Sequence, residues 1–205
     1  MRELWRYREL FYFLAWRDVA IRYKQTALGV LWVVIQPLFA TLVFTFLFGN
    51  LAKLPSDGAP HAIFYVSALL PWMFFSSALA NVGNSLISNV GLLTKVYFPR
   101  VILPASVALA GLVDLLIGSL LLGAIMLYYR IAPTWALLLW PALVVPLVAL
   151  TLGLGMFLAA LNVRYRDIKY AIPFAIQICL FLTPIIYPTS LFPEHWRPLF
   201  ALNPM

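Results

Sequence analysis

The sequence predicts an all-α integral membrane protein, and three observations support this fold class. Hydrophobic residues make up 64% of the 205 residues and charged residues only 10%, which is too little polar surface to cover a soluble core of this size. Lys and Arg are unevenly distributed along the chain. Apolar stretches long enough to cross a bilayer, which takes roughly 20 helical residues, occupy most of it. These five stretches are residues 27–50, 62–85, 102–128, 135–160 and 170–189.

The distribution of Lys and Arg predicts the orientation. If the N-terminus is cytoplasmic and the five spans alternate in direction, eleven basic residues fall inside and only Lys53, Arg130 and Arg197 fall outside, which is the positive-inside pattern. The net charge of +7 then faces anionic membrane lipids. A nucleic-acid partner is not expected, because that would need a basic folded domain. We expect one multi-pass transmembrane domain over residues 1–205, with its five spans within residues 27–189.

Residues 1–26 precede the first span and predict an amphipathic helix in the membrane interface. Aromatic rings would lie at headgroup depth and basic side chains toward the cytoplasm. A juxtamembrane anchor without further role is the alternative. One seam of the helix consists of Trp5, Tyr12, Trp16, Val19 and Tyr23, and another of the basic residues Arg6, Arg17 and Lys24.

Two polar residues interrupt apolar spans. Gln36 precedes Pro37 in the first span, where proline removes a helical hydrogen bond, so we predict a kink and a buried Gln36 that needs a partner. Asp114 lies inside the third span, where an ionised carboxylate costs about 2.5–3.5 kcal/mol to insert and should face protein or water. It is either a proton or ion relay, or a structural hydrogen-bonding group with a neighbouring helix, such as the Ser and Asn side chains of span two. We favour the structural interpretation, because no second buried ionisable group accompanies it.

The second span ends in a polar stretch, residues 76–89, which suits close helix packing or a water-filled path. Residues 90–104 then form a short amphipathic segment with Lys95 and Arg100, which we expect to lie as a helix on the cytoplasmic surface. In the fourth span Gly153 and Gly155 would let another helix approach closely. Prolines interrupt the end of the chain so closely that residues 184–200 are expected to form re-entrant or interfacial helices at the outer face.

The sequence contains no motif for catalysis. There is no G-x-x-x-x-G-K-[ST] loop, no G-x-S-x-G elbow and no His/Cys/Glu cluster with metal-ligand spacing. We therefore expect no enzyme activity, no catalytic residues and no metal site in this chain. If it moves cargo uphill, the energy comes from a partner or an ion gradient.

Four motifs in order along the chain resemble the ABC-2 permease family that exports bacterial cell-surface polysaccharides such as O-antigen, capsule and teichoic acid. The motifs are WRDVAIRYKQTALGVLWVVIQP, LLTKVYFPRVILP, NVRYRDIKYAIPFAIQICLFLTPIIYP and ALNPM. The resemblance implies an N-terminal interface helix, six spans, and two short re-entrant helices between the fifth and the sixth at the periplasmic side. The chain stops at Met205, where the family continues into its sixth span, so we expect a C-terminally truncated form.

The resemblance also implies partners and roles. Two copies pair around a channel in the bacterial inner membrane, and each binds a cytoplasmic ATPase that holds the ATP and Mg²⁺, so this chain binds no cofactor itself. The cargo is a lipid-linked polysaccharide. The residues expected to contact the ATPase are Lys95, Tyr97 and Arg100 in the first cytoplasmic segment and Arg164, Arg166 and Asp167 in the second.

Aromatic rings can hold the C–H faces of sugars without binding one hydroxyl tightly, which suits cargo that must slide. From the 16% of aromatic residues we nominate Trp32, Tyr65, Trp72 and Tyr187 as channel-facing, although most aromatic residues face lipid or the membrane interface.

Three alternatives remain open. An ABC-2 exporter of a small drug or lipid would share the fold. An ion-coupled transporter would use Asp114 as its proton site. A structural membrane protein would carry no cargo.

Overall fold

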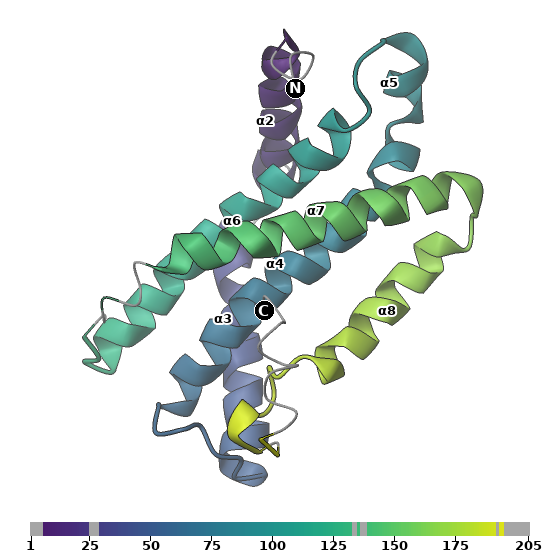
Figure 1. Cartoon of the computed structure of the whole chain (residues 1–205). Coiled ribbons are helices and arrows are strands. Elements are labelled where there is room, and N and C mark those ends of the chain that lie inside the picture. The colour runs from purple at the N-terminus through teal and green to yellow at the C-terminus, as the bar shows by residue number, and fades with distance from the viewer. Residues whose placement is uncertain (1–5, 25–28, 133–134, 136–138, 192, 195–205) are drawn as a thin grey trace. The chain divides into compact units, whose positions relative to one another are not determined.

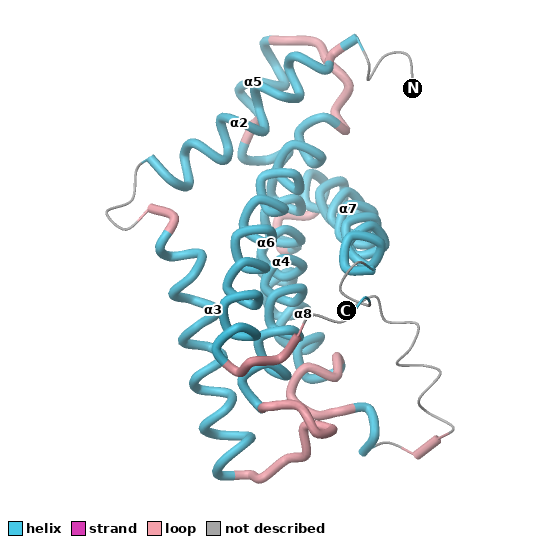
Figure 2. Tube along the Cα trace, turned by 90° about the vertical axis from the view of Figure 1, so that its left-hand side faces the viewer, coloured by secondary structure: helices cyan, strands magenta, loops and turns pink. Residues whose placement is uncertain are grey.

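The computed structural model describes residues 6–24, 29–132, 135, 139–191 and 193–194 of the chain. Within these residues the regular structure is helical throughout and no strand occurs, as the colouring of Figure 2 shows. The predicted all-α class is therefore confirmed. The elements in chain order are α2 (Arg8–Lys24), α3 (Leu31–Phe44), the π-helix η1 (Thr45–Leu51), α4 (His61–Ser88), α5 (Val90–Lys95), α6 (Ile102–Tyr128), α7 (Trp140–Arg164), α8 (Ile168–Leu182) and the short 3-10 helix η3 (Thr189–Leu191), which can be followed in Figure 1.

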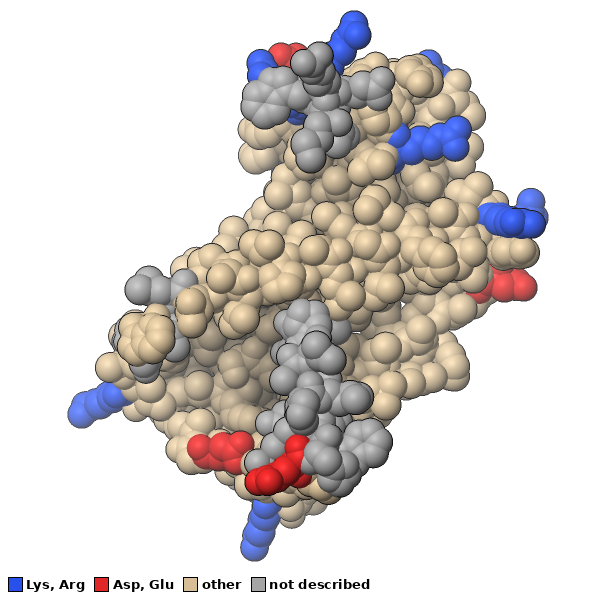
Figure 3. Space-filling model, viewed as in Figure 1, with Lys and Arg blue, Asp and Glu red and all other residues tan. Residues whose placement is uncertain are grey.

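Four of the five predicted spans correspond to helices that are long and apolar enough to cross a membrane. They are the continuous helix formed by α3 and η1 (Leu31–Leu51), then α4, α6 and α7. Figure 3 shows a face that is largely uncharged, with Lys, Arg, Asp and Glu near its margins. The fifth predicted span, residues 170–189, corresponds to α8, which has 15 residues and is shorter than the roughly 20 needed to span the bilayer. A fifth crossing therefore stays a prediction.

The predicted re-entrant segment, residues 184–200, is described only in part. Up to Glu194 its regular element is η3. Residues 195–200 and the ALNPM motif lie outside the described residues. The expectation of re-entrant helices is therefore untested.

The described residues divide into two compact units, each with parts of several helices. Unit 1 comprises the described residues of Met1–Val30, Phe74–Asp114 and Val148–Ile176, and unit 2 those of Leu31–Met73, Leu115–Leu147 and Gln177–Met205. Unit 1 thus contains α2, the end of α4, α5, the first half of α6, the second half of α7 and the start of α8.

Small residues set the helix packing in unit 1. Gly111 of α6 lies against the ring of Phe74 and the side chain of Ala78 in α4. Gly155 of α7 lies so close to α4 that a Cβ atom there would meet Cγ1 of Val82 at 2.5 Å. The expectation that a glycine of the fourth span admits another helix is confirmed for Gly155, whereas Gly153 has no side chain within 4 Å of such an atom.

In unit 2, α3 and η1 pack on the first turns of α4. Gly49 of η1 lies against the imidazole ring of His61. The ring centroid of Tyr65 lies 5.8 Å from that of Phe44 and 6.4 Å from that of Phe48. These rings form one aromatic layer between the two helices.

One predicted polar group of the first span is placed differently from our expectation. Pro37 of α3 is buried, but the side chain of Gln36 is exposed on the surface of the single chain. Successive helical residues point about 100° apart, so a helix that turns Pro37 toward its neighbours turns Gln36 away from them. Gln36 is therefore exposed within a single chain, and its burial in the assembled protein stays a prediction.

Candidate functional site

Residues 89–101, which connect α4 to α6 in unit 1, form the first candidate contact surface. The amide of Leu92 bonds to the carbonyl of Asn89 at 3.0 Å as α5 begins. After α5 the backbone is extended at Val96 and leads to Pro99, before which helical backbone is sterically disfavoured. We call residues 89–101 the 89–101 segment.

The inner side of the 89–101 segment is held by an apolar cluster. Phe98 is buried together with Leu14 of α2 and with Ile102 and Leu103 of α6. Burying a large apolar side chain contributes about 1.5–3 kcal/mol, so this cluster fixes the segment firmly against α2. The partly buried side chains around it are Tyr7, Leu10, Phe11, Leu86, Leu92 and Leu93.

The outer side of the same segment presents the predicted ATPase contacts. Lys95, Tyr97 and Arg100 are all exposed, and 92% of Tyr97 is accessible to solvent. Tyr and Arg are enriched among the residues that contribute most to protein–protein binding, so this stretch is suited to bind another protein. The structure thus brings the three predicted residues together on one stretch of surface.

The second predicted contact lies where α7 ends and α8 begins. Arg164, Arg166 and Asp167 are exposed, and the carbonyl of Asp167 accepts hydrogen bonds from the amides of Tyr170 and Ala171 in the first turn of α8. The guanidinium group of Arg164 lies 5.3 Å from the ring centroid of Tyr165. This turn is therefore a second basic and aromatic surface of unit 1.

Asn162 joins the helices that carry these two surfaces. Its side-chain amide donates to the backbone carbonyl of Gly83 at 3.0 Å and to Oδ1 of Asn84 at 2.9 Å. Because Asn162 is buried, these bonds fix the end of α7 against α4. The sequence analysis did not single out Asn162, although a polar residue just before a span ends in the NVRYRDIKY motif was a usable signal.

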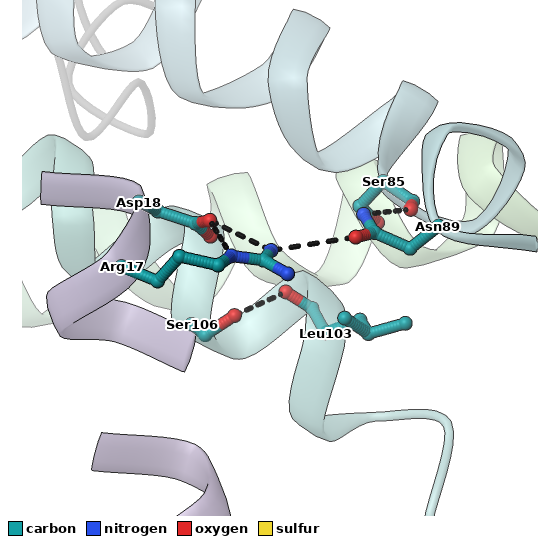
Figure 4. A network of polar contacts seen from close by, with 6 residues as sticks. All are labelled: Arg17, Asp18, Ser85, Asn89, Leu103 and Ser106. Atoms are coloured by element: carbon teal, nitrogen blue, oxygen red, sulfur yellow. Dashed lines mark hydrogen bonds and ion pairs between the residues drawn. The ribbon is translucent and has the colours of Figure 1, made fainter. Parts of the chain in front are cut away.

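A polar network joins α2 to the start of the 89–101 segment, as Figure 4 shows. The guanidinium group of Arg17 donates to Oδ1 of Asp18, at 2.8 Å from Nη2, and to Oδ1 of Asn89 at 3.3 Å. The side-chain amide of Asn89 in turn donates to the carbonyl of Ser85 at 2.9 Å. Our sequence analysis assigned Arg17 only to the basic face of the interface helix.

Asp114 is paired with the end of α2. Its carboxylate forms an ion pair with Arg22 and accepts a hydrogen bond from the hydroxyl of Tyr23. The side chain of Asp114 is 26% exposed, so it is partly rather than fully buried. A hydrogen-bonded partner on a neighbouring helix was expected, but this helix is α2 and not the second span.

The environment of Tyr23 keeps its hydroxyl protonated. Burial raises the pKa of Tyr23 above its ordinary value near 10, and the hydrogen bond to Asp114 and the negative charge of that carboxylate raise it further. Tyr23 is therefore a neutral hydrogen-bond donor throughout the physiological pH range.

The four aromatic residues nominated as channel-facing differ in exposure. Trp32 is exposed on α3, Tyr187 is half-buried, and Trp72 is buried. Tyr65 has no accessible surface. A single chain does not test which of them face a channel, so that assignment stays a prediction.

Comparison with known proteins agrees with this arrangement. The family model described as "ABC-2 type transporter" matches residues 9–205. The O-antigen export system permease protein RfbA of Myxococcus xanthus is 34% identical over 207 residues, which cover 100% of this chain and 79% of the relative. A protein of the same name from Klebsiella pneumoniae is 28% identical over 92% of this chain and 73% of its own length. The polysialic acid transport protein KpsM of Escherichia coli is 21% identical over 92% of this chain and 74% of its own length.

Proposed function

Since the chain belongs to the ABC-2 type transporter family, we propose that it is the membrane subunit of an ATP-driven exporter of a lipid-linked cell-surface polysaccharide. The observation that carries this proposal is its similarity, along its whole length, to a permease named for O-antigen export. The similarity to the polysialic acid transport protein supports a polysaccharide as the class of cargo. We place the protein in the bacterial inner membrane with its N-terminus in the cytoplasm.

The partner that supplies energy is a cytoplasmic ATPase. The sequence has no G-x-x-x-x-G-K-[ST] loop, so ATP and Mg²⁺ belong to a separate subunit. The 89–101 segment and the turn after α7 are the surfaces proposed to bind it. Both are exposed at Lys95, Tyr97, Arg100, Arg164, Arg166 and Asp167, and both are held from behind by packed helices of unit 1.

A second copy of the chain is proposed to complete the transport path. In the most apolar stretch of Leu31–Leu51 only 11% is buried within the chain, whereas in the most apolar stretch of α4 56% is buried. A helix that apolar and that open needs lipid or another protein around it. We propose that two copies enclose the path between them.

The alternatives differ in what they predict for Asp114 and for the cargo. In an ion-coupled transporter Asp114 would be the proton site, whereas in the structure its carboxylate is engaged by Arg22 and Tyr23 of α2. An ABC-2 exporter of a small drug or lipid would have the same fold and the same contact surfaces in a single chain. Transport measurements must separate these cargoes.

Two measurements test the proposal. The full-length chain, expressed in its host with a tag, should co-purify with an ATPase that carries the phosphate-binding loop. Deleting its gene should remove polysaccharide from the cell surface. The lipid-linked glycan should then accumulate on the cytoplasmic face of the inner membrane. Co-purification without any surface glycan defect would favour the small-molecule exporter, and the absence of any ATPase would refute the proposal.

A further inference from the structure

The interface helix α2 is attached within unit 1 at three places. One is the hydrogen bond from Arg17 to Asn89, at 3.3 Å. Near its middle, Leu14 is buried with Phe98, Ile102 and Leu103. At its end, Arg22 and Tyr23 both contact Asp114 of α6. From Leu14 to Arg22 is about 12 Å along a helix, and from Leu103 to Asp114 about 16 Å, so α2 follows α6 in the same direction over most of this length.

These attachments differ in the parts of unit 1 that they join. The apolar cluster around Leu14 and the hydrogen bond from Arg17 hold α2 to the 89–101 segment and to the first turn of α6. An ion pair and a hydrogen bond that converge on one carboxylate are directional. Of these attachments, the one at Asp114 joins α2 to α6 beyond the first turn of that helix.

The position of Asp114 gives this attachment a consequence for α6. Asp114 is the last residue of α6 that belongs to unit 1. An aspartate in an apolar helix is costly to place unless a partner stabilises it, and the two side chains that contact this carboxylate, Arg22 and Tyr23, both lie on α2. The residue is better explained by what α2 gains from it than by any benefit to α6 itself.

We propose that Arg22, Tyr23 and Asp114 form a clasp that makes α2, the 89–101 segment and the first half of α6 move as one body, so that displacement of the 89–101 segment reaches the membrane part of α6. These three are positioning residues for coupling and touch neither ATP nor cargo. The coupling role rests on the proposed function. The existence of the clasp does not.

The clasp itself is tested by hydrogen exchange on the purified complex with its ATPase. Asp114→Asn, Arg22→Gln and Tyr23→Phe should each speed amide exchange in the last two turns of α2, with the smallest effect for Tyr23→Phe, while residues 89–101 stay protected. Lys24→Gln is the matched control, because it removes an exposed cation from the same turn and leaves the contacts of Arg22 and Tyr23 with Asp114 in place. Unchanged exchange in both Asp114→Asn and Arg22→Gln would overturn the clasp.

Its role in coupling is tested by polysaccharide exported per ATP hydrolysed. Asp114→Asn and Arg22→Gln should retain ATPase binding and hydrolysis while export per ATP falls roughly tenfold, within the usual range of coupling between sites. The exchange of charges, Arg22→Asp with Asp114→Arg, should recover most of the loss. Proportional loss of hydrolysis and export, or no recovery in the exchanged pair despite normal α2 protection, would overturn the coupling role.

A covalent substitute gives an independent measurement. In a Cys179→Ser background, Arg22→Cys with Asp114→Cys should be uncoupled, and a bifunctional thiol reagent that bridges the two cysteines should restore export. Failure of the bridged form to export would also count against the coupling role. If the unmodified complex exports no polysaccharide at all, the proposed function fails, and the exchange measurement still decides whether the clasp exists.

Discussion

Hydroxyl groups inside the helices of this chain differ in whether they have a partner. Ser67, Ser85 and Ser106 each donate to a carbonyl of their own helix, at 2.9, 2.7 and 2.9 Å. In contrast, the buried hydroxyl oxygens of Thr41 and Tyr65 have no partner. Two tyrosines illustrate the contrast, because Tyr187 donates to the carbonyl of Phe181 at 2.6 Å whereas Tyr65 donates to no group.

We predict opposite effects of the same substitution at these two tyrosines. A buried polar group without a partner costs about 1–3 kcal/mol, and a made hydrogen bond contributes about 0.5–1.5 kcal/mol. Tyr65→Phe should therefore raise the stability of the chain, and Tyr187→Phe should lower it by about 1 kcal/mol. Thermal unfolding in detergent measures both, and a loss of stability in Tyr65→Phe would show that its hydroxyl has a partner after all.

Arg130 follows the C-terminal end of α6 and has a backbone conformation that favours glycine. Its φ is 55°, and the amides of Arg130 and Ile131 bond to the carbonyls of Leu127 and Met126 at 3.1 and 3.0 Å, which is the Schellman pattern with Arg130 at the left-handed position. A non-glycine residue there costs about 1–2 kcal/mol. Arg130→Gly should therefore stabilise the chain by about 1 kcal/mol.

The control for Arg130 is Arg130→Ala, which removes the same charge but keeps the backbone cost. Its unfolding temperature should stay close to that of the unchanged chain. If alanine stabilised as much as glycine, the effect would belong to the charge and not to the left-handed backbone.

At the scale of helices, apolar length predicted most elements from the sequence. The expected span 102–128 coincides with α6 (Ile102–Tyr128), and 62–85 falls within α4 (His61–Ser88). The sequence did not predict the π-helix η1, because a wider helical turn depends on packing such as that of Gly49 on His61 and has no composition of its own. Which glycine of α7 meets a neighbour was likewise not predictable, since both Gly153 and Gly155 fit the pattern.

The two glycines of α7 give a matched test of helix packing. In Gly155→Ala the new methyl group would lie 2.5 Å from Cγ1 and 2.9 Å from Cβ of Val82, and such overpacking typically costs 1–3 kcal/mol. In Gly153→Ala it meets no side chain within 4 Å, so the helix propensity of alanine should stabilise by about 1 kcal/mol. Thermal unfolding should thus shift in opposite directions, and equal shifts would mean that α4 and α7 are not in this contact.

For the whole molecule, the sequence predicted the class of protein but not the links inside it. Composition and the four ordered motifs were enough to indicate a membrane permease, because both can be read directly along the whole sequence. Arg22 and Asp114 are 92 residues apart and Asn162 and Gly83 are 79 apart, and a single sequence carries no signal for such pairs. The cytoplasmic position of the 89–101 segment, which rests on the distribution of Lys and Arg, stays a prediction.

One pair of exposed tyrosines at the two ends of α6 tests that orientation together with the ATPase contact. Tyr97 precedes α6 and is 92% exposed, and Tyr128 is its last residue and is 83% exposed. Central aromatic side chains at protein interfaces often cost 2 kcal/mol or more when truncated, so Tyr97→Ala should weaken ATPase binding about thirtyfold and leave unfolding unchanged. Tyr128→Ala should leave ATPase binding unchanged, because the predicted topology puts it on the opposite membrane surface. Equal loss in both variants would mean that the tyrosines act on folding, and loss only in Tyr128→Ala would invert the orientation of the whole chain.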